Sequence, residues 1–229
     1  MASQRFSFKY GKEQLSLSIE NARSIRVLEG APLPPLPDLG RAFLHGVTDG
    51  ALGVPLKDRL CPQDKITLVI SDITRFWMRQ DQIVSLLTAY LTETLGIPHE
   101  NIAILVALGT HRPMTEEELK TLVTPEVYAR FAVFNHDCLA DDPVFVGTTA
   151  RGTEVRVNPL CVGRKVIVIS GTVHHLMSGF GGGRKSILPG VSAKHTIVQN
   201  HLHCLHETEP RSADTIGMAK LTGNPVHED

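Results

Sequence analysis

Apolar and polar residues alternate strictly in two short stretches near the start of the chain, at 6–10 and 15–19. Alternation with a period of two, around a turn at 11–13, predicts a β-hairpin. The proline-rich stretch at 31–37 predicts a stiff extended connector, and the residues after it, 39–47, predict a short helix.

Three longer apolar runs, at 65–70, 101–108 and 165–170, predict the central strands of a sheet. Between the first two, residues 81–95 place apolar side chains at helical spacing, and Gly96 ends the pattern, which predicts parallel strands joined by a right-handed crossover. Residues 131–134, 144–146 and 154–157 predict shorter strands, and 115–122, 192–204 and 212–221 predict helices. The predicted fold class is α/β, a Rossmann-like, open and mostly parallel sheet with flanking helices, plus the N-terminal hairpin.

Length and composition are those of a globular protein. The chain has 229 residues, of which 42% are hydrophobic, and a formal net charge of -1. We find no basic block, no apolar run of about 20 residues and no apolar leader, so we expect a cytoplasmic protein whose partners are neither nucleic acid nor membrane. The cysteines are too scattered for a disulfide framework or a zinc ribbon: Cys61, Cys138, Cys161 and Cys204.

Residues 171–186 carry the most informative chemistry. Two adjacent imidazoles, His174 and His175, run into a glycine cluster that ends in Arg184 and Lys185. Glycines let a backbone approach a bound group and expose its N–H donors, so this segment is typical of an anion-binding loop. The phosphate loop of nucleotide triphosphatases is an alternative, although Arg184 occupies its second glycine position, and an ordinary glycine-rich turn is another.

Polar residues follow each of the three strong strands. Asp72 and Arg75 follow the first strand, His111 the second, and His175 and Lys185 the third. In an open parallel sheet the ligand crevice lies at the carboxyl ends of the strands, so these side chains are expected to converge. Two simpler interpretations stay open: Arg75 could pair only with Asp72, and a lone histidine is more often structural than catalytic.

Six of the eleven histidines lie between 174 and 206. Within this group, His203 and His206 share a helix face, but His201 and His203 do not, so a complete zinc site from this segment is disfavoured. A single histidine acting as a metal ligand needs no such spacing.

Taken together, the motifs resemble those of the nickel-pincer lactate racemase family of 2-hydroxyacid racemases and epimerases. The resemblance spans essentially the whole chain, and its motifs are Ser-Asp-Ile-Thr-Arg at 71–75, Ala-Leu-Gly-Thr-His-Arg at 107–112, His175 with the glycine-rich segment 178–190, Asn200-His201, and Gly-Asn-Pro-Val-His-Glu-Asp at 223–229. His174 stands where the family usually has proline.

The resemblance implies an isomerase with an unusual cofactor. It implies a nickel-pincer nucleotide, pyridinium-3,5-bisthiocarboxylic acid mononucleotide, linked covalently to Lys185, with His201 as a nickel ligand. Racemisation or epimerisation of a lactate-like 2-hydroxyacid would proceed by proton-coupled hydride transfer to the pyridinium. Inversion through a planar keto intermediate needs a base on each of two approaches, which His111 and His175 can supply.

The remaining roles implied by the resemblance concern binding. Arg75 would hold the substrate carboxylate, and the following residues would seat the cofactor: Asp72, Thr74, Gly181, Gly182 and Gly183. Cofactor-biosynthesis proteins are the expected partners beside the small 2-hydroxyacid.

The resemblance also bears on domain organisation. Family members carry a C-terminal domain that closes over the site, so we expect residues 1–229 to be the N-terminal cofactor-binding catalytic domain, with that second domain absent and this chain inactive by itself. The alternative functions are a module that binds a nucleotide or carboxylate without catalysis, and a zinc hydrolase, for which no ligand motif is present.

Overall fold

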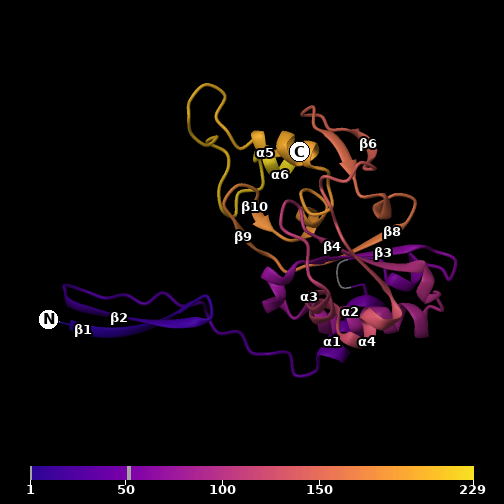
Figure 1. Cartoon of the computed structure of the whole chain (residues 1–229), viewed down its shortest axis with the longest axis horizontal. Coiled ribbons are helices and arrows are strands. Elements are labelled where there is room, and N and C mark those ends of the chain that lie inside the picture. Colours follow the sequence, from indigo (N-terminus) through magenta and orange to yellow (C-terminus); the bar gives the residue numbers. More distant parts are fainter. Residues whose placement is uncertain (1, 51–52) are drawn as a thin grey trace. The chain divides into compact units, whose positions relative to one another are not determined.

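A computed structural model describes residues 2–50 and 53–229 (Figure 1). The chain divides into two compact units, one ending at Pro37 and the other spanning Asp38–Asp229. No helix among the described residues is long and apolar enough to cross a membrane.

The first unit is the predicted hairpin. Strands β1 (Ala2–Tyr10) and β2 (Glu13–Ala22) pair antiparallel, with Phe6 opposite Leu17. Gly11 has a φ of 59° in the connecting turn, a conformation that costs glycine little. The alternation prediction is therefore confirmed, although both strands extend beyond the predicted stretches.

The second unit is built on a four-stranded sheet with the order β5-β4-β3-β8 (Figure 1). Its strands are β3 (Ile66–Ser71), β4 (Ile102–Ala107), β5 (Ala132–Asn135) and β8 (Lys165–Ile169), and all neighbours pair in parallel. Every residue of β3 is buried, as expected of a central parallel strand covered on both faces. The predicted α/β sheet is confirmed.

Four helices cover one face of this sheet (Figure 1): α1 (Leu39–Thr48), α2 (Gln80–Ala89), α3 (Glu116–Val123) and α4 (Pro125–Arg130). Leu87 and Leu122 of these helices belong to the same buried core as Leu68 of β3. Val69 and Leu105 point to the opposite face, where they meet Val191, because successive side chains of a strand alternate between faces.

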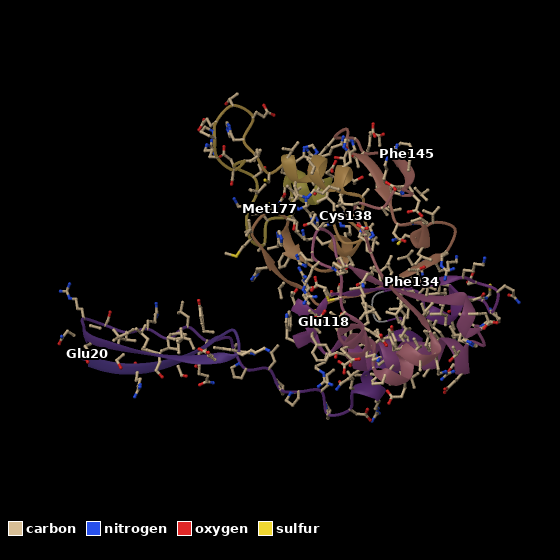
Figure 2. The ribbon with its side chains drawn as sticks, viewed as in Figure 1. Glu20, Glu118, Phe134, Cys138, Phe145 and Met177 are labelled. Carbon is tan, nitrogen blue, oxygen red and sulfur yellow. The ribbon has the colours of Figure 1, made fainter. Side chains whose placement is uncertain are left out.

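Shorter elements complete the unit. The helical turns are η1 (Leu56–Asp58), η2 (Ile73–Met78), η3 (Tyr90–Thr94), η4 (His99–Asn101), η5 (Pro159–Cys161) and η6 (Gly183–Ser186). Two hairpins, β6 (Val144–Thr148) with β7 (Glu154–Val157) and β9 (Val173–His175) with β10 (Gly179–Gly181), and the helices α5 (Lys194–Leu202) and α6 (Pro225–Glu228) follow along the chain. Phe145 of β6 lies on the surface of this part of the unit (Figure 2).

One predicted helix is wrong. Residues 212–221 form turns and bends instead, and Ala219 has a φ of 62°, which no right-handed helix contains. The N–H of Ala219 donates to the carbonyl of Gly179, at 2.9 Å. This N–H group, which in a helix would donate to a carbonyl of the preceding turn, thus donates to β10, far away in the sequence.

Candidate functional site

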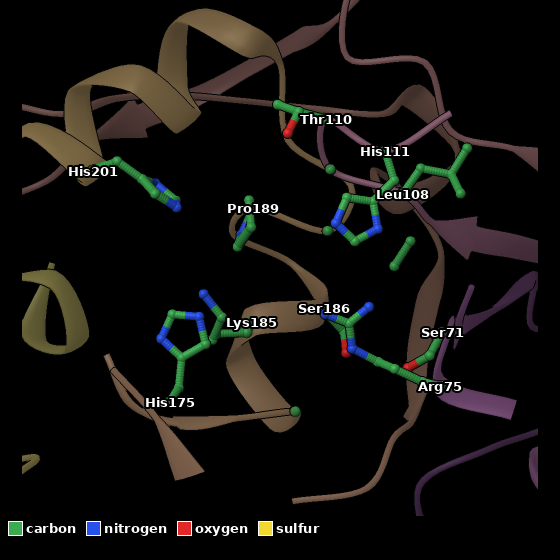
Figure 3. A pocket seen from close by; sticks show the side chains of 14 residues that line it. Ser71, Arg75, Leu108, Thr110, His111, His175, Lys185, Ser186, Pro189 and His201 are labelled. Carbon is green, nitrogen blue, oxygen red and sulfur yellow. The ribbon is translucent and has the colours of Figure 1, made fainter. Parts of the chain in front are cut away.

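The carboxyl ends of β3 and β4, together with segments that follow β8 in the chain, line a cavity of about 200 Å³. Figure 3 shows the side chains that line it, and five of the predicted residues are among them: Arg75, His111, His175, Lys185 and His201. They come from five different segments, namely η2, the loop after β4, β9, η6 and α5. The sheet edge therefore assembles them as its topology requires.

Asp72 lies next to this pocket and forms hydrogen bonds with residues that line it. It follows β3 directly and its side chain is fully buried. Its carboxylate accepts hydrogen bonds from the N–H and the hydroxyl of Thr74, from Arg75 Nη1 at 3.3 Å and from His111 Nδ1 at 2.5 Å. Burial favours a raised pKa for Asp72, but the bonds from Thr74 and His111 and the charge of Arg75 hold the pKa below its usual value. Asp72 thus stays ionised and orients its neighbours.

His111 is held by the loop after β4. The N–H of Gly109 donates to the carbonyl of Gly190 at 2.9 Å, and Gly109 has a φ of 56° against the ring of Pro189. His111 Nδ1 faces the ionised Asp72, so that nitrogen carries the proton and donates it. Nε2 is left with its lone pair, and 47% of the side chain is exposed.

His175 and Lys185 lie half-buried on the opposite side of the pocket from His111 (Figure 3). Burial is the main cause that lowers the pKa of His175 to about 4, and the nearby charges of Lys185 and Arg75 act in the same direction, so its imidazole is neutral at physiological pH. Burial and the charge of Arg75 also lower the pKa of Lys185. A lysine whose pKa is lowered is a better nucleophile, because its unprotonated amine is more populated.

His201 presents a metal-binding nitrogen. Its Nδ1 donates to the carbonyl of Ile197 at 2.8 Å, one turn earlier in α5, which leaves Nε2 unprotonated. Burial is the main cause of the lowered pKa of His201, which keeps the ring neutral. By contrast, His203 and His206 line a different cavity, and the described residues contain no group of three or more His, Cys, Asp or Glu side chains placed to hold a metal.

The other predicted residues lie at or near the pocket. Gly182 lines it, and a Cβ there would lie 2.1 Å from the carbonyl oxygen of Gly171, so only glycine fits. Gly181 and Gly183 flank it without lining the cavity, and Thr74 is exposed beside Asp72. The fully buried side chain of Asp72 faces Thr74, Arg75 and His111, so it acts on the pocket through them rather than by touching a ligand.

Sequence reasoning did not single out several lining residues: Ser71, Leu108, Thr110, Ser186, Pro189 and Gly190. All of them adjoin or lie within the quoted motifs, so the rule that ligands bind at the ends of parallel strands pointed to their neighbourhood. Their side chains carry no chemical signal that would distinguish them from other polar or apolar loop residues.

Comparisons with known proteins identify the family of this chain. Residues 10–213 match the family described as the lactate racemase N-terminal domain. The chain is 33% identical over 131 residues to lactate racemase of Thermoanaerobacterium thermosaccharolyticum, a match that covers 56% of this chain and 30% of that protein. It is 34% identical over 133 residues to lactate racemase of Lactiplantibacillus plantarum, covering 57% and 29% respectively.

Solved structures share the fold. The lactate racemase apoprotein from T. thermosaccharolyticum superimposes with a TM-score of 0.72 at 23% identity, over 99% of this chain and 52% of that one. A protein from Thermotoga maritima superimposes with a TM-score of 0.63 at 25% identity, over 88% and 47%. The present chain thus spans about half the length of these solved relatives. By its sequence match over residues 10–213, the chain belongs to the lactate racemase N-terminal domain family.

Proposed function

We propose that this chain carries the cofactor-binding and proton-transfer residues of an isomerase that racemises or epimerises a lactate-like 2-hydroxyacid. The observation that carries the proposal is the convergence of Arg75, His111, His175, Lys185 and His201 on one cavity. The two curated relatives are named lactate racemase. Such chemistry requires a group that binds the substrate carboxylate, two imidazoles, an amine and a metal-binding nitrogen, and these five residues supply that set.

We further propose that the cofactor is the nickel-pincer nucleotide, attached to Lys185 with His201 as a nickel ligand. The donor set supports this assignment, because His201 lines the pocket and offers one unprotonated nitrogen. Lys185 Nζ makes no hydrogen bond within the described part of the chain, and its lowered pKa favours the amine that forms an amide-type link. The backbone at Gly182 can approach a bound nucleotide closely.

When bound, the cofactor would supply an acceptor for the hydride that leaves the substrate carbon. Arg75 would bind the substrate carboxylate: Nη1 is bonded to Asp72, whereas Nη2 and Nε make no hydrogen bond among the described residues. His111 would accept the hydroxyl proton at Nε2 while Asp72 stabilises the imidazolium. His175 would contact the hydroxyl oxygen of the substrate from the other side of the pocket.

The test is to produce a full-length enzyme that contains this domain together with the cofactor-biosynthesis proteins, and to measure its intact mass, nickel content and interconversion of 2-hydroxyacid enantiomers. Lys185→Ala is expected to abolish the covalent adduct and racemisation, because the amine that forms the link is gone. His201→Ala is expected to keep the adduct and lose most of the nickel.

Lys194→Ala, a change of an exposed lysine at the start of α5, is the matched control and should keep the adduct. An adduct that persists in Lys185→Ala would contradict the tether. Retention of 2-hydroxyacid binding with no adduct and no racemisation in the unaltered protein would instead support a binding module without catalysis.

A further inference from the structure

The motif at 223–229 has no role in the chemistry described so far. It forms a capped helical turn, α6, in which Asn224 Oδ1 accepts from the N–H groups of Val226 and His227. Asn224 is fully buried, and its Nδ2 donates outside the motif, to the carbonyl of Met177 at 2.8 Å and to that of Lys220 at 3.0 Å. Every hydrogen-bonding atom of this amide is therefore used.

The bond to Met177 reaches the segment that follows His175. The N–H groups of Met177 and Ser178 both donate to His175 Nδ1, each at 3.2 Å. Ser178 is buried, and its hydroxyl donates to the carbonyl of Phe180, which closes the turn between β9 and β10. The turn thus directs two backbone donors at one ring nitrogen of His175.

A ring nitrogen that accepts hydrogen bonds cannot carry a proton. The proton of neutral His175 must therefore lie on Nε2, the nitrogen that remains available to the pocket. His111 has the opposite arrangement, because its Nδ1 donates to Asp72 and its Nε2 has a free lone pair. The two imidazoles are thus not equivalent: His175 offers a hydrogen-bond donor, and His111 offers an acceptor.

The same motif contacts the segments of the other two site residues. Arg184, next to Lys185, donates from Nη2 to the imidazole of His227. Asn200, next to His201, donates from Nδ2 to Asp229 Oδ2 at 2.9 Å and to the carbonyl of Val226 at 3.2 Å. One short motif therefore contacts the segments that carry His175, Lys185 and His201.

We propose that Asn224 is a positioning residue, which through Met177 holds the turn that keeps the proton of His175 on Nε2. His175 then donates a hydrogen bond into the pocket while His111 accepts one. The role of this arrangement in catalysis rests on the proposed function. The substrate hydroxyl would donate to His111, and His175 would stabilise the charge that develops on the hydroxyl oxygen.

The experiment uses long-range proton–nitrogen NMR spectra of the histidine rings of the chain, which distinguish a protonated Nε2 from a protonated Nδ1. The signals are assigned with His175→Gln and His111→Gln. We expect the unaltered chain to show His175 protonated on Nε2 and His111 on Nδ1. Finding His175 protonated on Nδ1, or as an even mixture, would overturn the inference.

Asn224→Ser is the selective variant, because serine still caps a helix but cannot also reach Met177. We expect it to lose the single tautomer of His175 and to leave His111 unchanged. Asp38→Ala, which removes the cap of α1 away from the pocket, is the matched control and should alter neither ring. An unchanged His175 spectrum in a folded Asn224→Ser chain would overturn the role of Asn224.

These spectra need neither cofactor nor substrate. A failure of the tautomer assignment therefore leaves the proposed racemase function standing, and a failure to racemise leaves the tautomer assignment standing.

Discussion

At the scale of single residues, the buried carboxylate of Asp72 joins the loops after two neighbouring strands. It receives hydrogen bonds from Thr74 and Arg75 in its own segment and from His111 in the next loop. A buried charge is tolerated only when it is paired and hydrogen-bonded, and Asp72 is both. The carboxylate that stabilises the fold at this point therefore also fixes which nitrogen of His111 is free to act.

Replacing either pocket histidine is expected to impair racemisation in both directions. For His111→Ala and His175→Ala, made in a full-length enzyme that contains this domain, we expect losses of about 10²- to 10⁴-fold in kcat, the usual range for a proton-transfer group, with nickel content unchanged. Steady-state assays starting from each enantiomer provide the measurement. Near-normal turnover by either variant would show that its histidine does not take part in proton transfer or charge stabilisation.

His136 predicts an acid-sensitive fold. It is buried, its Nε2 donates to the carbonyl of Ser192 at 3.0 Å, and burial lowers its pKa. In the unfolded chain, the pKa of His136 has its ordinary value of 6.5. As pH falls, the unfolded chain therefore binds a proton at this residue before the folded chain does. The free energy of unfolding should be highest above pH 6.5 and decrease below it, and His175 should contribute in the same direction.

Urea unfolding at a series of pH values between 7 and 5 tests this, with His136→Gln keeping a donor towards Ser192. The variant should show a shallower decrease in stability than the unaltered chain. His45→Gln, at an exposed histidine of α1, is the control and should leave the slope unchanged. Equal slopes in His136→Gln and the unaltered chain would contradict the assignment.

The sequence predicted which residues would meet at the pocket, but not how their side chains would pair. An arginine three residues after Asp72 suggested the Arg75 contact from spacing alone. The contact between Asp72 and His111 spans 39 residues and depends on the parallel register of β3 and β4. Tautomers were beyond sequence reasoning, since they depend on backbone N–H groups whose direction only the folded turn defines.

At the scale of secondary-structure elements, helix α3 anchors the loop that carries His111. Thr115 and Glu118 form a capping box at its start, and Arg112 binds Glu118 through two hydrogen bonds, at 2.6 and 2.7 Å. Glu118 is the third residue of this helix and is labelled in Figure 2. The carboxylate of Glu118 therefore both caps α3 and holds the loop that carries His111.

Thr115→Ala is expected to lower the free energy of unfolding by about 1 kcal/mol, the usual cost of losing a helix cap. The measurement is urea unfolding at pH 7, where the midpoint should fall and the slope should not change. Thr121→Ala, on the exposed face of the same helix, is the matched control and should change stability by less. Equal effects of the two substitutions would show that the capping box contributes nothing.

Elements were predicted well where local pattern and tertiary contacts agree. The runs at 65–70, 101–108 and 165–170 became β3, β4 and β8 because β-branched apolar runs suit the strands of a parallel sheet, of which β3 and β4 are buried almost throughout and β8 only in part. The helix expected at 81–95 is α-helical only to Ala89 and continues as the π-helical turn η3. Residues 212–221 were misjudged because Gly179 of β10 takes the N–H of Ala219.

At the scale of the whole molecule, the pocket is open to solvent on the described part of the chain. Arg75 and His111 each have nearly half of their side-chain surface exposed, at 45% and 47%. The proposed hydride transfer would need water to be excluded from the reacting groups. The described residues bring the site side chains together but leave the pocket open to solvent.

Assayed by itself under cofactor-loading conditions, the 229-residue chain is therefore expected to be folded but to racemise 2-hydroxyacids at no more than a trace of the rate of a full-length relative such as the T. thermosaccharolyticum enzyme. Circular dichroism and chiral chromatography of the product acid provide the measurements. Comparable turnover by the two proteins would show that the open pocket is sufficient.

The parallel sheet that assembles the pocket also separates the residues that stabilise the core from the residues that shape the pocket, so the two sets can change independently. Core side chains such as Leu68 and Ile104 lie within strands, whereas Thr110 and Ser186 line the cavity from segments beyond them. Exchanging the exposed Thr110 changes the shape offered to a ligand without opening a void among the buried strands. A substitution at such a position would thus change what the pocket can accept with little effect on the melting temperature.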